Sequence, residues 1–274
     1  MLKNWITSLV VMVLFVVPSV DAQEQAEALP ADEPQPKQAI DPVAAAIKQV
    51  NEQDNGITIN KEDAYVDVKA TVCLRRGDFL EMFACTKDTR EHESILVIDA
   101  VPSKMHLGLL LLGLEPGKPL SYDMKVDPPR LVPASGPKVG VFIVIKLDDI
   151  EREIPANRWV QDNKTQEMMQ SNTWLFAGSQ FAEFQDKPIY QADLNGSAIS
   201  LVNFGDDLLT LPNKMTDANE SHDKVWVPRT QAIPEVGTKV TIRLRPVAED
   251  KNEDKIKDDP AKNPPPLPVP EAKE

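Results

Sequence analysis

The chain has 274 residues and a formal net charge of −13, which comes from 43 acidic and 30 basic side chains. Nucleic-acid binding needs a basic face that displaces counterions from phosphates, and no cluster of Lys or Arg supplies one. We therefore exclude nucleic acid as a partner. The ends hold most of the acidic excess: residues 23–54 carry seven acids and two bases, and residues 248–274 carry eight acids and five bases.

Residues 1–22 read as a secretory signal peptide. Lys3 supplies the positive charge, residues 5–17 form an apolar run, and Pro18 breaks it before the small residue Ala22. As a helix, that apolar run would span only ~20 Å, which is short of the ~30 Å hydrocarbon core of a bilayer. We expect cleavage between Ala22 and Gln23, no transmembrane anchor in the mature chain, and an extracytoplasmic location, periplasmic or secreted.

The two ends of the mature chain have the composition of spacers. Residues 23–54 form an acidic linker rich in Pro, Ala and Glu, in which Asp41 and Pro42 could open a short helix over 42–51. Residues 248–274 are charged and then proline-rich, so we expect a disordered tail. Residues 265–268 also fit a polyproline ligand motif, but an extended spacer is the favoured interpretation.

Between these ends, residues 55–247 show a pattern of strands with one helix. The helix is expected at about 103–114 and, being apolar all round, should be buried on nearly every side. Asn195-Gly196 is a signal for a hairpin turn. The predicted fold class is α+β: a sheet-dominated single domain with one buried helix and disordered N- and C-terminal tails. The expected strands are 57–59, 65–74, 79–85, 94–100, 139–147, 174–177, 189–192, 198–203 and 240–244.

An exported chain with two cysteines, Cys73 and Cys85, raises the question of a disulfide. If strands 65–74 and 79–85 form a hairpin, Cys73 lies opposite Leu80 or Met82, and Cys85 then faces the other side of the sheet. A β-bulge would rescue the bridge. The disulfide therefore stays an alternative, and two buried thiols are favoured.

The densest group of chemically active side chains follows the second cysteine. Cys85, His92 and His106 could ligate zinc, with a neighbouring carboxylate acting on a bound water. The spacing matches no zinc signature, however, and the favoured interpretation is a tight turn at 87–90 held by hydrogen bonds. No residue is assigned a catalytic role. The candidate polar cluster consists of Cys85, Glu91, His92, Glu93, Ser94 and His106.

Several short motifs occur in a fixed order between residues 57 and 246. They are Val72-Cys73-Leu74-Arg75-Arg76-Gly77, Phe83-Ala84-Cys85, Glu91-His92-Glu93-Ser94, His106, Leu109–Leu114 with Glu115-Pro116-Gly117, Trp174-Leu175-Phe176-Ala177-Gly178-Ser179, Tyr190-Gln191-Ala192-Asp193, Val202-Asn203-Phe204, Leu209-Thr210-Leu211-Pro212 and Ile233-Pro234 to Arg245-Pro246. With these motifs, the chain resembles the YdjY-domain family of exported bacterial proteins. The resemblance implies a bacterial envelope protein and no established reaction.

Some relatives in that family carry a ferredoxin-type label. An iron–sulfur cluster needs four thiolates, and this chain has two cysteines, so we do not carry that role over. We expect no cofactor. The favoured function is a non-enzymatic binding or structural domain of the cell envelope, with an unidentified protein or small ligand as partner. The alternative is a metal-binding protein or metal-assisted hydrolase centred on His92.

Overall fold

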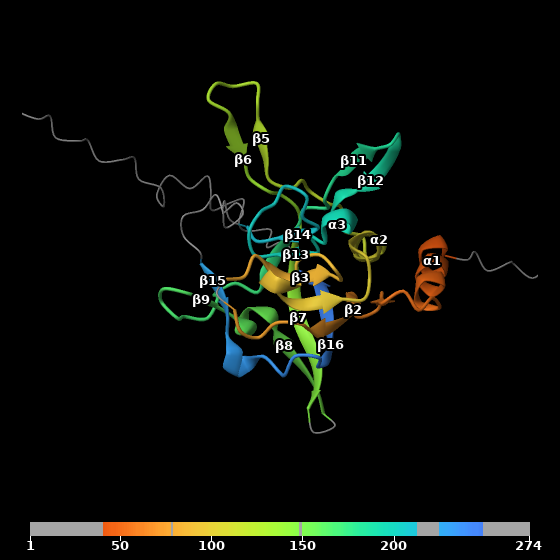
Figure 1. The fold of residues 1–274 in the computed structure, drawn as a ribbon. Helices are drawn as coiled ribbons and strands as arrows, with labels where there is room; N and C mark the ends of the chain where they lie inside the picture. The colour runs from red at the N-terminus through yellow and green to blue at the C-terminus, as the bar shows by residue number, and fades with distance from the viewer. Residues whose placement is uncertain (1–40, 78, 148–149, 213–224, 249–274) are drawn as a thin grey trace, which may run out of the picture. The chain divides into compact units, whose positions relative to one another are not determined.

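Eight β-strands close into a barrel (Figure 1). The computed structural model describes residues 41–77, 79–147, 150–212 and 225–248. The predicted cleavage point between Ala22 and Gln23, the linker up to residue 40 and the tail from residue 249 lie outside the described residues. None of the helices in the described ranges has the length and apolar character needed to cross a bilayer.

Neighbouring barrel strands are antiparallel, except for the pairs β13–β14 and β3–β4, which are parallel. The barrel closes because the last strand in the order, β4, pairs with the first, β2. In order around the barrel, the strands are β2 (Tyr65–Val72), β16 (Lys239–Pro246), β7 (Lys138–Leu147), β10 (Thr173–Phe176), β14 (Leu209–Thr210), β13 (Ile199–Ser200), β3 (Met82–Thr86) and β4 (Ser94–Ile98).

Closure depends on two strands that each divide one edge between two partners. The first half of β2 pairs with β1 (Ile57–Asn60), and residues 70–72 of the same edge pair with β4. In the same way, residues 138–140 of β7 pair with β10, and residues 142–147 pair with β8 (Ile150–Pro155). Each long strand therefore leaves one neighbour and takes up another partway along its length, which lets the sheet curl onto itself.

The predicted α+β class with one buried helix was wrong, although the expected dominance of strands is correct. The main helix, α2 (Pro102–Leu111), buries only one side against the barrel, and Leu110 is 42% exposed. At Gly108 the helix lies close to β2, because a Cβ there would lie 3.0 Å from a Val66 methyl group. The sequence misled because the leucines of this helix spread around its axis, and only tertiary contact decides which side is covered.

The interior of the barrel is filled by apolar side chains at every second position. On β2 these are Val66, Val68, Ala70 and Val72, all essentially inaccessible, while the residues between them are at least partly exposed. Facing strands contribute their own inward sets, including Ile242 from β16. This period of two is what a sheet with one dry face and one wet face requires.

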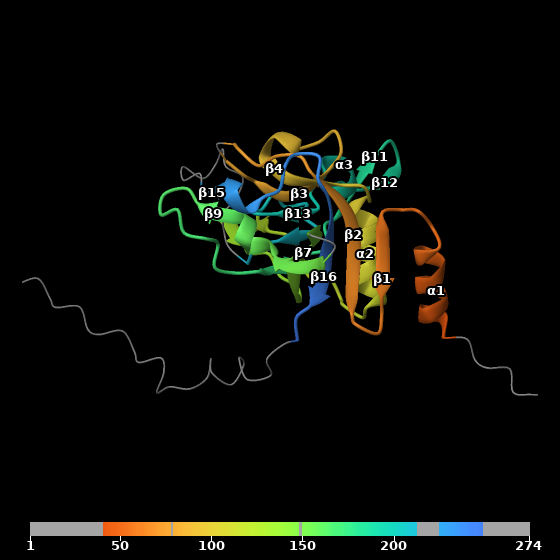
Figure 2. The same ribbon diagram turned by 90° about the horizontal axis from the view of Figure 1, so that it is seen from below.

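Helix α1 (Pro42–Asn51) covers the free edge of β1 (Figure 2). The Asp41 side chain caps it by accepting a hydrogen bond from the Val43 amide at 2.9 Å. At its other end, the Asn51 side-chain amide bonds to both the N–H and the C=O of Ile59, each at 2.8 Å. Asn51 thus imitates a neighbouring strand and satisfies an edge that would otherwise attract another chain.

Two hairpins project from one end of the barrel: β5–β6 (Ser121–Asp123 and Arg130–Val132) and β11–β12 (Phe181–Phe184 and Lys187–Tyr190) (Figure 1). The Gly117 amide, at the base of β5–β6, donates to the carbonyl of Phe176, the last residue of β10, at 2.9 Å. The short helix α3 (Gln191–Asn195) follows β12 and ends at Gly196, whose φ of +77° is left-handed. The Asn195-Gly196 pair therefore ends a helix and does not form the predicted hairpin turn.

The remaining elements are β9 (Val160–Asp162), β15 (Trp226–Pro228) and the 3₁₀ turns η1 (Glu91–Glu93), η2 (Ala156–Trp159) and η3 (Thr230–Ala232).

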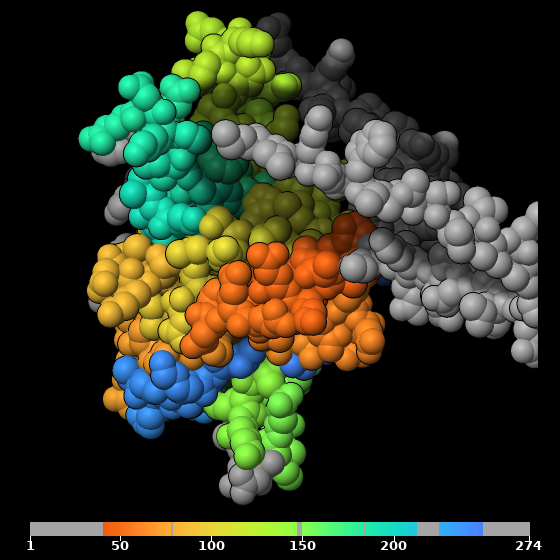
Figure 3. Space-filling view, turned by 90° about the vertical axis from the view of Figure 1, so that its right-hand side faces the viewer, coloured from red at the N-terminus to blue at the C-terminus, as the bar shows by residue number. Residues whose placement is uncertain are grey.

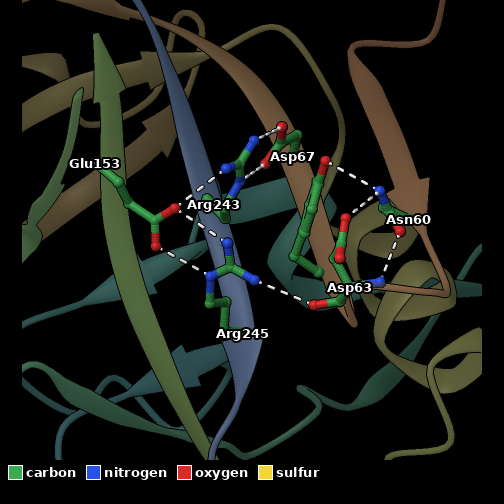
Figure 4. A network of polar contacts seen from close by, with 7 residues as sticks. Asn60, Asp63, Asp67, Glu153, Arg243 and Arg245 are labelled. Carbon is green, nitrogen blue, oxygen red and sulfur yellow. Dashed lines mark hydrogen bonds and ion pairs between the residues drawn. The ribbon is translucent and has the colours of Figure 1, made fainter. Parts of the chain in front are cut away.

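An ion-pair network joins β2, β16 and β8 across the outside of the barrel (Figure 4). Arg243 donates two 2.7 Å hydrogen bonds to Asp67 and one of 3.1 Å to Glu153, and its guanidinium lies 4.0 Å from the Tyr65 ring centroid. Arg245 also pairs with Glu153. The hydrogen bonds that Arg243 donates to Asp67 raise the pKa of the guanidinium. Because Arg243 and its partners are mostly shielded, this network should contribute more than a typical surface ion pair.

We expect Arg243→Met to lower the free energy of unfolding by about 2 kcal/mol, because it leaves Asp67 and Glu153 without their shared cation. Arg152→Met on β8 is the matched control: Arg152 is exposed, and its loss should change stability by less than about 0.5 kcal/mol. Urea denaturation of both variants measures the difference. If both variants lost the same free energy of unfolding, the network would contribute no more to stability than an exposed arginine.

Candidate functional site

The predicted polar cluster lies around η1 but does not form one site. Cys85 on β3 is fully buried, and burial raises the pKa of its thiol. Ser94 is also fully buried, and its hydroxyl donates to the Leu96 carbonyl at 2.8 Å. The carboxylate of Glu91 accepts a hydrogen bond from the Asp88 amide, so Glu91 holds the turn. These contacts are structural.

The three predicted metal ligands lie in three different surroundings. The His92 side chain is 78% exposed, and its Nε2 lies 3.8 Å from a Glu93 oxygen, while Glu93 itself pairs with Arg90 at 3.0 Å. Cys85 is inside the fold, and His106 lies on α2 with other partners. Among the described residues, no group of three or more His, Cys, Asp or Glu side chains is placed to hold a metal ion.

His106 belongs to a chain of hydrogen bonds at the base of the β11–β12 hairpin. Its Nδ1 lies 2.7 Å from the Tyr190 hydroxyl, which donates to the Gly178 carbonyl at 2.8 Å. Because the Tyr190 proton goes to a carbonyl that can only accept, the arrangement assigns the imidazole proton to Nδ1. The Phe176 ring packs edge-on against the imidazole, with centroids 4.9 Å apart. Burial lowers the pKa of His106 and raises that of Tyr190.

Both cysteines are free thiols. The hairpin on which the parity argument was based does not exist, because β4 lies between β2 and β3. The strand paths of Cys73 and Cys85 are separated by two strand spacings of about 4.8 Å each, or about 10 Å in total. A disulfide tolerates only ~7 Å between Cα atoms. Cys73 instead donates to the Ser94 carbonyl at 3.1 Å, and burial raises its pKa to about 12. A reactive thiolate is therefore not favoured at Cys73.

A buried acidic pair was missed at the sequence level. Asp206 is 6% exposed and Asp207 fully buried, in the loop between β13 and β14. Asp207 accepts hydrogen bonds from the amides of Phe204 and Gly205 at 2.9 and 3.1 Å, yet burial still raises its pKa to about 7. The available signal was two adjacent acids placed directly before the apolar run that begins at Leu208.

Exposed apolar side chains mark the end of the barrel that carries the two hairpins. On the β5–β6 hairpin, Tyr122 is 48% exposed and Met124 74%. At the second hairpin, Phe181 is 71% exposed and contacts Tyr190 edge-on, and Leu194 on α3 is 61% exposed. Figure 3 shows α3 and β11–β12, in teal, on the same side of the molecule as the β5–β6 hairpin. Sequence analysis did not identify this surface.

We expect acidification to destabilise the fold through His106. A histidine whose pKa is lowered on folding contributes stability above its unfolded pKa of about 6.5, and that contribution is lost as the pH falls. His106→Gln, which can still donate to Tyr190, should flatten the dependence of unfolding free energy on pH between about 6.5 and 5. Urea denaturation across that range measures the slope. An unchanged slope in the variant would contradict this role.

The YdjY domain model matches residues 57–245 of this chain, which include every barrel strand but the last residue of β16. Comparison with curated proteins found no significant match. Comparison with solved structures also found none. The chain belongs to the YdjY domain family.

Proposed function

We propose that this member of the YdjY domain family is an exported, non-enzymatic binding domain of the cell envelope. It contacts a partner protein through the end of the barrel that carries the β5–β6 hairpin, the β11–β12 hairpin and α3. We call this surface the hairpin end. Export rests on the signal-like segment 1–22, and the binding role rests on the surface described above.

The observation that carries the proposal is the distribution of exposed apolar side chains. Half of the large apolar residues that are exposed in the described part of the chain lie at the hairpin end: Tyr122, Met124, Val126, Val132, Phe181 and Leu194. Monomeric proteins rarely leave such groups uncovered together, and patches of this kind commonly mark protein interfaces. Tyr, Phe and Met are also the residue types enriched in the centres of interfaces.

A small ligand inside the barrel is less well supported, because inward side chains fill the interior. Ile143, Trp174 and Ile242 are each at most 1% exposed and belong to one continuous core. The hollows found among the described residues lie on the outer surface, and one of about 880 Å³ runs between α1 and β1. The alternative of a hydrolase centred on His92 gains no support from the position of that side chain, which is mostly exposed.

Site-specific photo-crosslinking in living cells of the source bacterium tests this proposal. A photoreactive residue replaces Met124 or Phe181 at the hairpin end, or Ile150 or Val236 as controls. The controls are also exposed, at 57% and 58% against 74% and 71%, but lie at the opposite end of β7 and β16. We expect discrete adducts with one envelope protein from Met124 and Phe181 and none from the controls, on a chain that begins at Gln23.

A double substitution at the hairpin end tests whether the crosslink depends on this surface. Tyr122→Ser combined with Val132→Ser should abolish the Phe181 adduct without shifting the thermal melting temperature by more than about 2 °C, because both side chains are already exposed. Adducts that form equally at all four positions would contradict a defined binding end. A chain that retains residues 1–22 in the cytoplasm would contradict export.

A further inference from the structure

Four buried oxygen atoms lie in two adjacent segments and have no hydrogen-bond partner. They are the hydroxyls of Ser197 and Ser200 and one carboxylate oxygen, Oδ1, of each of Asp206 and Asp207. Ser197, Ser200 and Asp207 are completely buried, and Asp206 is 6% exposed. Buried polar atoms are almost always satisfied, so four such atoms together indicate that a bound species completes them.

The backbone brings the two segments that carry these residues side by side. The amides of Leu208 and Leu209 donate to the carbonyls of Ser197 and Ala198 at 3.0 and 3.1 Å, so the two segments run side by side. The parallel register pairs Ile199 with Leu209, which, extended by two residues, places Ser197 beside Asp207 on the same face. The Ser200 hydroxyl is close enough to Asp207 to influence its ionisation, although it makes no hydrogen bond of normal geometry.

Within the described ranges, no basic side chain forms an ion pair with this group. The second oxygen of Asp207 is taken by two backbone amides, and that of Asp206 by the Asn195 side-chain amide. The guanidinium of Arg90 lies 4.0 Å from the Phe204 ring centroid, but its ion pairs within the described residues are with Glu81 and Glu93. Burying unpaired carboxylates away from bulk solvent is costly, so a positive charge is expected there.

We propose that Asp206, Asp207, Ser197 and Ser200 form a calcium site. All four free ligands are oxygens, which suit a hard cation and not zinc or copper, and two carboxylates neutralise a divalent ion. Water completes the coordination shell. With only two charged ligands, the dissociation constant should be on the order of 10⁻⁴–10⁻³ M, the range of extracellular calcium modules.

An ion at this site would stiffen the contacts between the loop that joins β13 and β14 and the segments from which both hairpins start. The Ser179 amide donates to the Asp207 carbonyl at 2.8 Å, and the Gln180 side chain donates to the Gly205 carbonyl at 3.0 Å. Both donors lie directly before β11. Gly205 also approaches the Leu120 carbonyl at the base of the β5–β6 hairpin. An ion bound to Asp206 and Asp207 would therefore tie the loop between β13 and β14 to the bases of both hairpins.

The test compares thermal unfolding of the full chain refolded in 10 mM CaCl₂ with the same chain in EDTA and NaCl of equal ionic strength. Refolding is included because the ligand oxygens are buried. We expect calcium to raise the melting temperature by roughly 3 °C, and equilibrium dialysis against ⁴⁵Ca to give one bound ion per chain. Asp207→Asn and Ser200→Ala should each remove both effects. Asp186→Asn, which removes an exposed acid at a φ of +60° that Asn tolerates, should keep both.

Two outcomes would overturn the proposal. The first is an identical melting temperature in calcium and sodium with no bound ion in dialysis, in which case a proton on Asp207 accounts for the buried charge. The second is a calcium shift that is as large in Ser200→Ala as in Asp186→Asn, which would indicate general screening of an acidic surface. Ser200→Ala keeps the test decisive even if Asp207→Asn does not fold.

Discussion

The pairing of β4 with the second half of β2 is the contact on which the rest of the fold depends. Three residues of β2, Ala70 to Val72, meet Leu96 to Ile98 of β4, and this short ladder turns an open sheet into a barrel. It can form only because β1 occupies just the first half of the same edge. Without closure, β2 and β4 would each present an unpaired edge, which invites association with other chains.

Closure also separates the chemistry of the two faces. The inside is dry and filled, so charged and polar groups on the long strands must lie outside, where Arg243, Asp67 and Glu153 join three strands into one network. Half of the large apolar side chains that stay exposed in the described part of the chain are gathered at the hairpin end. The buried acids Asp206 and Asp207 depart from this division, and their unpaired carboxylate oxygens led us to propose a bound cation.

How much could be predicted from the sequence depended on the range of the interactions involved. The strands with strict alternation were found because the period of two is a local property: the predicted strands 65–74 and 240–244 correspond to β2 and β16. Closure was not found, because it joins residues through pairings that no local pattern encodes. The same limit affected the site: the argument about Cys73 and Cys85 assumed that consecutive strands pair, and β4 separates them. His106 was grouped with Cys85 by distance in sequence, whereas the fold places it against Tyr190.

Amide hydrogen exchange at the β2–β4 seam tests the closed barrel most directly. The amides of Cys73 and Asp99 donate across this seam to the Ile95 and Lys69 carbonyls, each at 3.0 Å. If the barrel is closed, both amides should exchange only through global unfolding, with the same opening free energy as amides between β16 and β7. Exchange of Cys73 and Asp99 at the rate of exposed loop amides, while the β16–β7 amides stay protected, would show that the sheet is open at this seam.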